Sequence, residues 1–177
     1  MSQGISISAF LLTTISSVHA GTITASPKTT ATVSSTCNLS VTNISFGNYN
    51  PAGGDISTQG SINLLCTKGT AVSIGMERNP GVDTVTCPNY SLSFCYANGV
   101  RYMSDSASHA LYYQIFASSN FSSSTVIPGP GWFVGNNYIT TKATGATQSI
   151  SFWGALSGNQ WVNPGDYTDT VTAIVTY

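Results

Sequence analysis

The residues best suited to acid–base chemistry are few. Of the two histidines, His19 lies in an apolar N-terminal stretch, and His109 directly precedes a predicted strand. His109 would need a nucleophile and an orienting acid to act as a general base, and serines are too widespread to indicate one. Asp166 and Asp169 flank a predicted turn and strand start, which aspartate favours, so they are not paired catalytic carboxylates. Without a phosphate loop, HExxH or DxDxDG pattern, the sequence predicts no enzyme, no cofactor and no metal site.

The cysteines suit covalent cross-linking better than metal binding. They are Cys37, Cys66, Cys87 and Cys95. An even number in an exported chain predicts two disulfides, for which three connectivities are possible. The short segment CPNYSLSFC favours Cys87–Cys95, which leaves Cys37–Cys66. A zinc site lacks both CxxC spacing and a nearby histidine, whereas each disulfide would contribute about 2–4 kcal/mol.

Charge is scarce in this sequence. Charged residues make up 6% of the chain, with a net charge of −1, and Ser, Thr, Asn and Gly replace them on the surface. Five basic residues cannot form a phosphate-binding patch, which excludes nucleic acid as a partner. Weak colloidal repulsion suits a protein that assembles. It suits a Thr/Ser-rich secreted sandwich equally well.

The N-terminus has the pattern of an export signal. Residues 5–20 are apolar and then polar, and they end on Val18-His19-Ala20, a small-x-small pattern. We therefore predict that residues 1–20 are a signal peptide cut after Ala20. The stretch is too short to span a membrane, and no later segment stays apolar for roughly 18 residues. The sequence predicts export without a membrane span.

Period-two patterns predict strands along the remaining chain. The last stretch places Val171, Ala173, Val175 and Tyr177 on one face, as in a half-buried strand. Other predicted strands cover residues 37–46 (with Leu39, Val41 and Phe46 buried), 60–66, 71–76, 110–117 and 148–156, a hairpin at 83–95, and a weak strand at 21–36 interrupted by Pro27. Seven or eight short strands without a helical period predict an all-β antiparallel sandwich.

One loop could present aromatic side chains to solvent. Trp132 and Phe133 lie between the proline and glycine residues of PGPGWF. Such a loop could contact a surface or a sugar. The alternative, which we favour, is that both side chains cap the end of the sandwich core.

Three segments together resemble a known family. They are CNLSVTNISFGNYNP, ALYYQIFAS and SFWGALSGNQWVNPGDYTDTVTAIVTY. Through these segments the sequence resembles the spore coat protein U domain. That domain is shared with pilins of the archaic (Csu-type) chaperone–usher pathway. The resemblance runs from about Val33 to Tyr177, and the pair Cys37–Cys66 resembles the usual first disulfide of that family.

The resemblance implies an immunoglobulin-like sandwich that lacks its last strand. A periplasmic chaperone would first fill the resulting groove. At an outer-membrane usher, the N-terminal segment of a neighbouring pilin subunit would replace the chaperone by strand addition. Residues 21–33 would be this donor segment, offering Ile23, Ala25, Ala31 and Val33 to the neighbour. Residues 34–177 would be the pilin domain, with Val171, Ala173, Val175 and Tyr177 on a groove wall that the chaperone contacts.

The implied function is structural. The chain would be a pilin subunit of a surface fibre (a fimbrium) that supports cell adhesion and biofilm formation. Two alternatives remain: a tip-proximal adhesin that uses Trp132 and Phe133, and a self-standing spore or cell coat protein. The donor segment departs from the family pattern at Pro27 and Lys28, because proline cannot donate a hydrogen bond to a strand paired on both sides.

Overall fold

Residues 20–78, 93, 101–127 and 138–177 are described by a computed structural model. The strands are β1 (Cys37–Val41), β2 (Ile56–Cys66), β3 (Ala71–Arg78), β4 (Arg101–Ser104), β5 (Ala110–Phe116), β6 (Ile139–Lys142), β7 (Gln148–Leu156) and β8 (Val171–Thr176). One short 3₁₀ turn, η1 (Ser123–Thr125), is the only helical element in these ranges.

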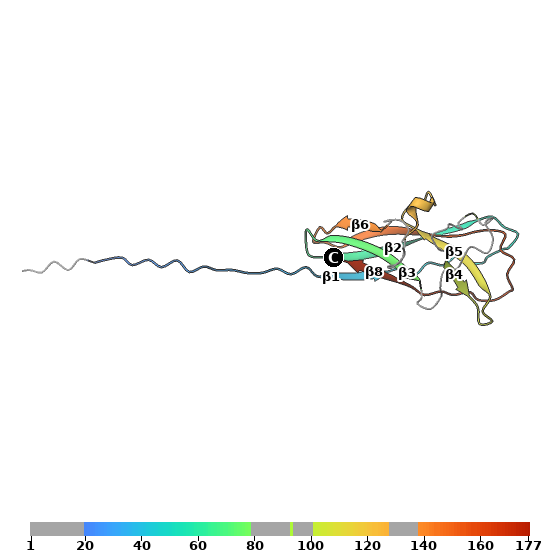
Figure 1. Cartoon of the computed structure of the whole chain (residues 1–177), viewed down its shortest axis with the longest axis horizontal. Coiled ribbons are helices and arrows are strands. Elements are labelled where there is room, and N and C mark those ends of the chain that lie inside the picture. Colours follow the sequence, from blue (N-terminus) through green and yellow to red (C-terminus); the bar gives the residue numbers. More distant parts are fainter. Residues whose placement is uncertain (1–19, 79–92, 94–100, 128–137) are drawn as a thin grey trace, which may run out of the picture. The chain divides into compact units, whose positions relative to one another are not determined.

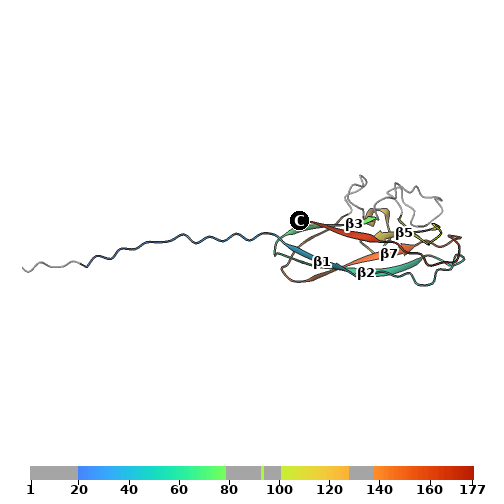
Figure 2. The same ribbon diagram turned by 90° about the horizontal axis from the view of Figure 1, so that it is seen from below.

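The strands form two antiparallel sheets (Figures 1 and 2). One sheet has five strands in the order β1-β2-β7-β5-β4, and the other has three in the order β6-β3-β8. The pairing of β2 with β7 runs from Ile56 opposite Leu156 to Leu64 opposite Gln148. The predicted all-β sandwich is confirmed. The strands at 110–117 and 148–156 correspond to β5 and β7, whereas the four-residue β4 and β6 were too short to show a pattern.

The core lies between the two sheets. Alternate residues of β2 and β3 point inward, as the two-residue period of a strand requires. The buried members of this core include Ile62, Leu64, Val72, Ile74, Met76, Leu111, Tyr113, Ile115, Phe152 and Leu156. One glycine is needed for the packing: a Cβ at Gly60 would lie 2.3 Å from Cζ of Phe152. The aromatic ring therefore occupies the space that a side chain at Gly60 would fill.

A buried arginine connects the two sheets. Arg101 of β4 is 4% exposed. Its guanidinium donates to the side-chain oxygen of Gln114 in β5, to the carbonyl of Met76 at 2.6 Å and to that of Ile127 at 2.9 Å. Because β6 pairs with β3 only as far as Ile74, the Met76 carbonyl lies beyond the end of that pairing. Arg101 thus fastens β4 of the larger sheet to β3 of the smaller one.

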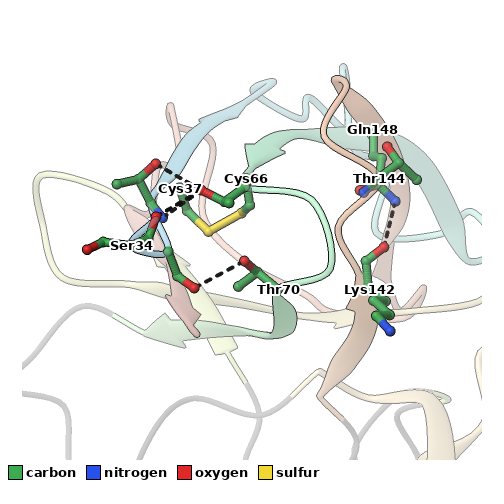
Figure 3. The surroundings of a disulfide bond; sticks show 10 residues. Ser34, Cys37, Cys66, Thr70, Lys142, Thr144 and Gln148 are labelled. Atoms are coloured by element: carbon green, nitrogen blue, oxygen red, sulfur yellow. Dashed lines mark hydrogen bonds between the residues drawn. A yellow bond between two sulfur atoms is a disulfide. The ribbon is translucent and has the colours of Figure 1, made fainter. Parts of the chain in front are cut away.

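A disulfide and several hydroxyl groups hold the start of β1 (Figure 3). Cys37 and Cys66 are joined, with their sulfur atoms 2.04 Å apart, at a point where they face each other across β1 and β2. Next to the disulfide, the Thr36 amide donates to the Thr67 hydroxyl at 3.1 Å, and the Thr67 amide donates to the Thr36 carbonyl at 3.0 Å. The Thr70 hydroxyl contacts that of Ser35 at 3.3 Å. The chain is therefore fixed from about Ser34 onward.

Two expectations about the first third of the chain were wrong. Residues 20–36 contain no strand, and Ile23 is 96% exposed. A single extended segment has no partner for its backbone groups and is not stable as a strand by itself. Leu39 and Val41, which we expected to be buried, are 37% and 42% exposed. In the described part of the chain, no strand pairs with the free edge of β1. The side chains of Leu39 and Val41 point inward and remain accessible from this edge.

Candidate functional site: an open groove into the core

A groove of about 1000 Å³ opens into the sandwich. Among the described residues, β1 pairs only with β2 and β8 pairs only with β3. Each of these strands therefore has one edge with unpaired backbone groups. The groove lies between the stretch from Val41 to Pro51 on one side and the stretch from Val162 to Ala173 on the other.

The floor of the groove is the hydrophobic core itself. It is formed by side chains of β3, β4, β5 and β7, namely Met76, Met103, Leu111, Tyr113, Ile115, Phe152 and Leu156. Most of these side chains are buried. A groove with such a floor and with strand edges on its walls can accept an extended segment whose alternate side chains are apolar.

The first wall follows the FGNY turn. Phe46 packs edge-on against Tyr113, with ring centroids 5.8 Å apart. Tyr49 donates from its hydroxyl to the Ser157 carbonyl at 3.2 Å and accepts from the Gln160 amide at 2.8 Å. Burial is the main reason that the pKa of Tyr49 is raised. These contacts hold the wall in place although it contains no strand beyond Val41.

The second wall ends in β8. Val171 and Ala173 line the groove, and Val175 packs against the core on the same face. Tyr177 follows the last residue of β8, is 58% exposed and lines a separate shallow hollow of about 520 Å³. The wall is therefore shorter than the sequence pattern suggested, because the strand ends before Tyr177.

The described charges of the groove are all negative. Asp166 and Asp169 are the only charged residues among its described lining. The buried hydroxyl of Tyr113 donates to Asp169 Oδ2 at 2.6 Å, and Asp169 Oδ1 accepts from the Thr170 amide at 2.7 Å. Burial, followed by the charge of Asp169, raises the pKa of Tyr113 far above its usual value. The hydroxyl therefore stays protonated and remains a donor to Asp169.

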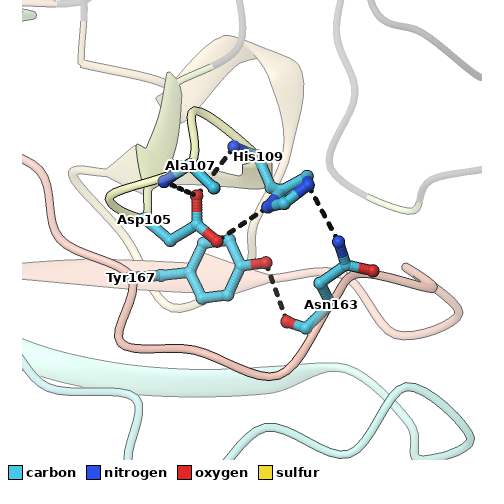
Figure 4. Close-up of polar contacts among 5 residues, drawn as sticks. All are labelled: Asp105, Ala107, His109, Asn163 and Tyr167. Carbon is cyan, nitrogen blue, oxygen red and sulfur yellow. Dashed lines mark hydrogen bonds and ion pairs between the residues drawn. The ribbon is translucent and has the colours of Figure 1, made fainter.

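His109 has a structural environment at the rim of this groove (Figure 4). Its Nδ1 lies 2.7 Å from Asp105 Oδ2, and its Nε2 lies 2.8 Å from Asn163 Nδ2. Tyr167 donates from its hydroxyl to the Asn163 carbonyl at 2.8 Å. Nδ1 thus holds the ring within the turn between β4 and β5, and Nε2 connects that turn to Asn163 of the groove wall. This arrangement positions a loop of the groove wall.

The contact with His109 predicts a dependence of stability on pH. The hydrogen bond from His109 is the largest cause of a lowered pKa for Asp105. A lowered pKa stabilises the fold above the unfolded value of about 3.9, and this stabilisation is lost as the pH falls below it. We expect the free energy of unfolding to decrease between about pH 5 and pH 3, and Asp105→Asn to make this decrease smaller.

Urea denaturation at a series of pH values measures this effect. His109→Asn is an independent second variant, because it removes the main cause of the pKa shift and should flatten the acid limb in the same direction. Unchanged slopes in both variants would show that the Asp105–His109 contact does not contribute.

The structure brings together only part of the residue set that the sequence indicated. Val171 and Ala173 line the groove, whereas residues up to Thr32 fall into a unit separate from 33–177. Cys87, Cys95, Trp132, Phe133 and the predicted hairpin at 83–95 lie outside the described residues. The floor of the groove and the roles of Tyr113, Asn163 and Tyr167 were missed, because they depend on contacts between distant strands. Only the FGNY turn was visible as a motif.

Comparisons with known proteins agree with this architecture. The model of the spore coat protein U domain matches residues 23–174, and no curated protein matches the sequence. A solved complex of the CsuC chaperone with the CsuE tip adhesion subunit, from archaic chaperone–usher Csu pili of Acinetobacter baumannii, superposes with a TM-score of 0.51. It shares 19% identity and covers 82% of this chain, whereas this chain covers 40% of that one.

A second solved structure is more distant. The HdaB minor tip subunit of the E. coli Hda pilus gives a TM-score of 0.39 at 16% identity, over 78% of this chain and 79% of that one. In the described part of the chain, no helix has the length and apolarity to cross a membrane. Since the family model spans most of the sequence, the chain belongs to the spore coat protein U domain family.

Proposed function

We propose that the protein is a structural, non-enzymatic pilin subunit that polymerises by donor-strand exchange. In this proposal, the groove of one subunit receives the N-terminal segment, residues 21–33, of a neighbouring subunit. The observation that supports it is the groove of about 1000 Å³ that reaches the core and includes the free edges of β1 and β8 in parts of its walls. Such edges and an apolar floor favour aggregation unless another chain covers them.

The donor segment has side chains that suit the groove. Four of its side chains are apolar and occupy odd-numbered positions, so in an extended segment they would lie on the same face. They are Ile23, Ala25, Ala31 and Val33. Burying the isoleucine and the valine would contribute about 1.5–3 kcal/mol each, and ladder hydrogen bonds would add to this. In the present structure both are accessible, at 96% and 81% exposure.

The cellular partners follow from the same proposal. A periplasmic chaperone covers the groove before assembly, and an outer-membrane usher exchanges it for the next subunit. The similar Acinetobacter subunit was crystallised with its chaperone in a pre-assembly complex, which supports this order of events. The exported fibre then lies at the cell surface and contributes to adhesion and biofilm formation.

Production of the mature chain, residues 21–177, with and without a chaperone tests the proposal. Alone, the chain should aggregate or form polymers, because the open groove exposes the core. With the chaperone, or with an excess of a peptide of residues 21–36, it should be recovered as a discrete complex by size-exclusion chromatography. A stable monomer that unfolds cooperatively at high dilution without either partner would show that the fold is complete by itself.

A further inference from the structure

The distribution of charge suggests which chain supplies the donor strand. Charged residues are only 6% of the sequence, so their positions are informative. Lys28 is the only charged residue between residues 21 and 36. Asp166 and Asp169 are the only charged residues in the described lining of the groove. A donor with one positive charge therefore has a receiving surface with the opposite charge.

The positions along the groove also agree. Lys28 lies close to the middle of residues 21–33, and the two aspartates lie in the central part of the wall that runs from Val162 to Ala173. A donor that fills the groove brings its middle to the middle of this wall, whether it runs parallel or antiparallel to β8. The approach of Lys28 to the two carboxylates does not depend on the direction of the donor.

The same position removes the difficulty posed by Pro27. A proline interrupts a ladder only where a strand pairs with its backbone. In the middle of the groove, neither wall is a strand, because β1 ends at Val41 and β8 begins at Val171. Pro27 would therefore face irregular backbone. Ladder hydrogen bonds with β1 or β8 would be made by donor residues to one side of Pro27 along the chain.

We infer that the groove is filled by residues 21–33 of a second copy of this chain, with Lys28 paired to Asp166 and Asp169. This inference rests on the proposed function and adds to it that the polymer is formed from identical subunits. The ammonium group would reach carboxylate oxygens whose other contacts, to Tyr113 and the Thr170 amide, already fix the position of Asp169. The pair would select both the segment and its register.

A competition experiment tests this pairing. The full mature chain is refolded with a fluorescently labelled peptide of its own residues 21–36, and unlabelled peptides compete for the groove. We expect Lys28→Gln to weaken competition about three- to fivefold, as for a partly exposed charge pair. We expect Lys28→Glu to weaken it further and Lys28→Arg to compete like the wild type. Raising the salt from about 20 mM to about 500 mM should reduce the difference to less than about twofold.

The protein variants show whether the two aspartates are the partners. With Asp166→Asn/Asp169→Asn, the wild-type and Lys28→Gln peptides should compete equally, since no charge remains to be lost. If this variant does not fold, Asp166→Asn alone, at an exposed position, should reduce the difference in competition between the wild-type and Lys28→Gln peptides. Glu77→Gln is the matched control: Glu77 follows the groove-lining Met76 in β3 and points to the opposite face, so the difference should persist.

The outcomes separate the two proposals. A peptide with Ile23→Asn and Val33→Asn should fail to compete if residues 21–33 fill the groove at all. If it fails while Lys28→Gln and Lys28→Glu compete like the wild type at low salt, the charge pairing is wrong and the proposed function stands. If the wild-type peptide itself does not compete, both proposals are wrong.

Discussion

Deleting residues 21–33 is expected to abolish polymer formation and to leave the groove able to receive a donor. The physical reason is that the donor and the groove lie in different parts of the chain: the floor and walls come from residues 41–173, and none of them is removed. The shortened chain should still bind the peptide of residues 21–36 with unchanged affinity. Polymer length, measured by size-exclusion chromatography with light scattering and by electron microscopy, reports the loss.

Mixing experiments make this prediction sharper. A subunit that can receive a donor but cannot provide one occupies one end of a polymer and prevents growth there. Increasing amounts of the deletion variant should therefore shorten wild-type polymers in proportion to its mole fraction. A chain with Ile23→Asn and Val33→Asn, which keeps the length of the segment, should behave in the same way. Polymers of normal length from the deletion variant would exclude residues 21–33 as the donor.

Arg101→Met is expected to lower the free energy of unfolding by about 3–5 kcal/mol. Methionine is apolar and of comparable volume but shorter, so the loss combines the removed hydrogen bonds with the space left where the guanidinium lay. The carbonyl oxygens of Met76 and Ile127 would lose the buried guanidinium donor. The buried side-chain oxygen of Gln114 would lose it too and would retain the Ile115 amide as a donor. Urea denaturation of the peptide-filled protein measures the change.

Two further variants locate the effect. Arg101→Lys retains the charge with a smaller donor head, and should fall between methionine and the wild type. Lys142→Met removes a charge from an exposed position in β6, and should alter stability by less than about 0.5 kcal/mol. If Arg101→Met were as stable as the wild type within about 1 kcal/mol, the connection between the sheets would not contribute to the fold.

The fold was predictable where a strand shows its pattern in isolation. Ala110–Phe116 and Gln148–Leu156 alternate strongly enough to be identified directly. Leu39 and Val41 obey the same pattern in β1, yet they are exposed. Periodicity gives the face on which a side chain lies, and burial depends on whether another strand covers that face.

The site was less predictable because its parts are distant in the sequence. Val171 and Ala173 stood out through alternation, but the floor of the groove combines four strands. Asp169 looked like an ordinary turn residue until the structure placed its carboxylate against the hydroxyl of Tyr113. Likewise, His109 resembled a lone catalytic candidate, and its role in holding the 163–167 stretch depends on Asn163. Such contacts have no local signature.

The Cys37–Cys66 bond has a mechanical consequence for a fibre built from such subunits. Tension on the donor segment would enter each domain at the chain before Cys37, where the hydroxyl contacts of Ser34–Thr36 end. The disulfide transmits the pull directly to β2, which is paired with β7 from Ile56 to Leu64. Because β1 is bonded covalently at the point of loading, it cannot be peeled from its neighbour one hydrogen bond at a time. The pull is instead resisted in shear along the long β2–β7 ladder, in which all the hydrogen bonds share the force.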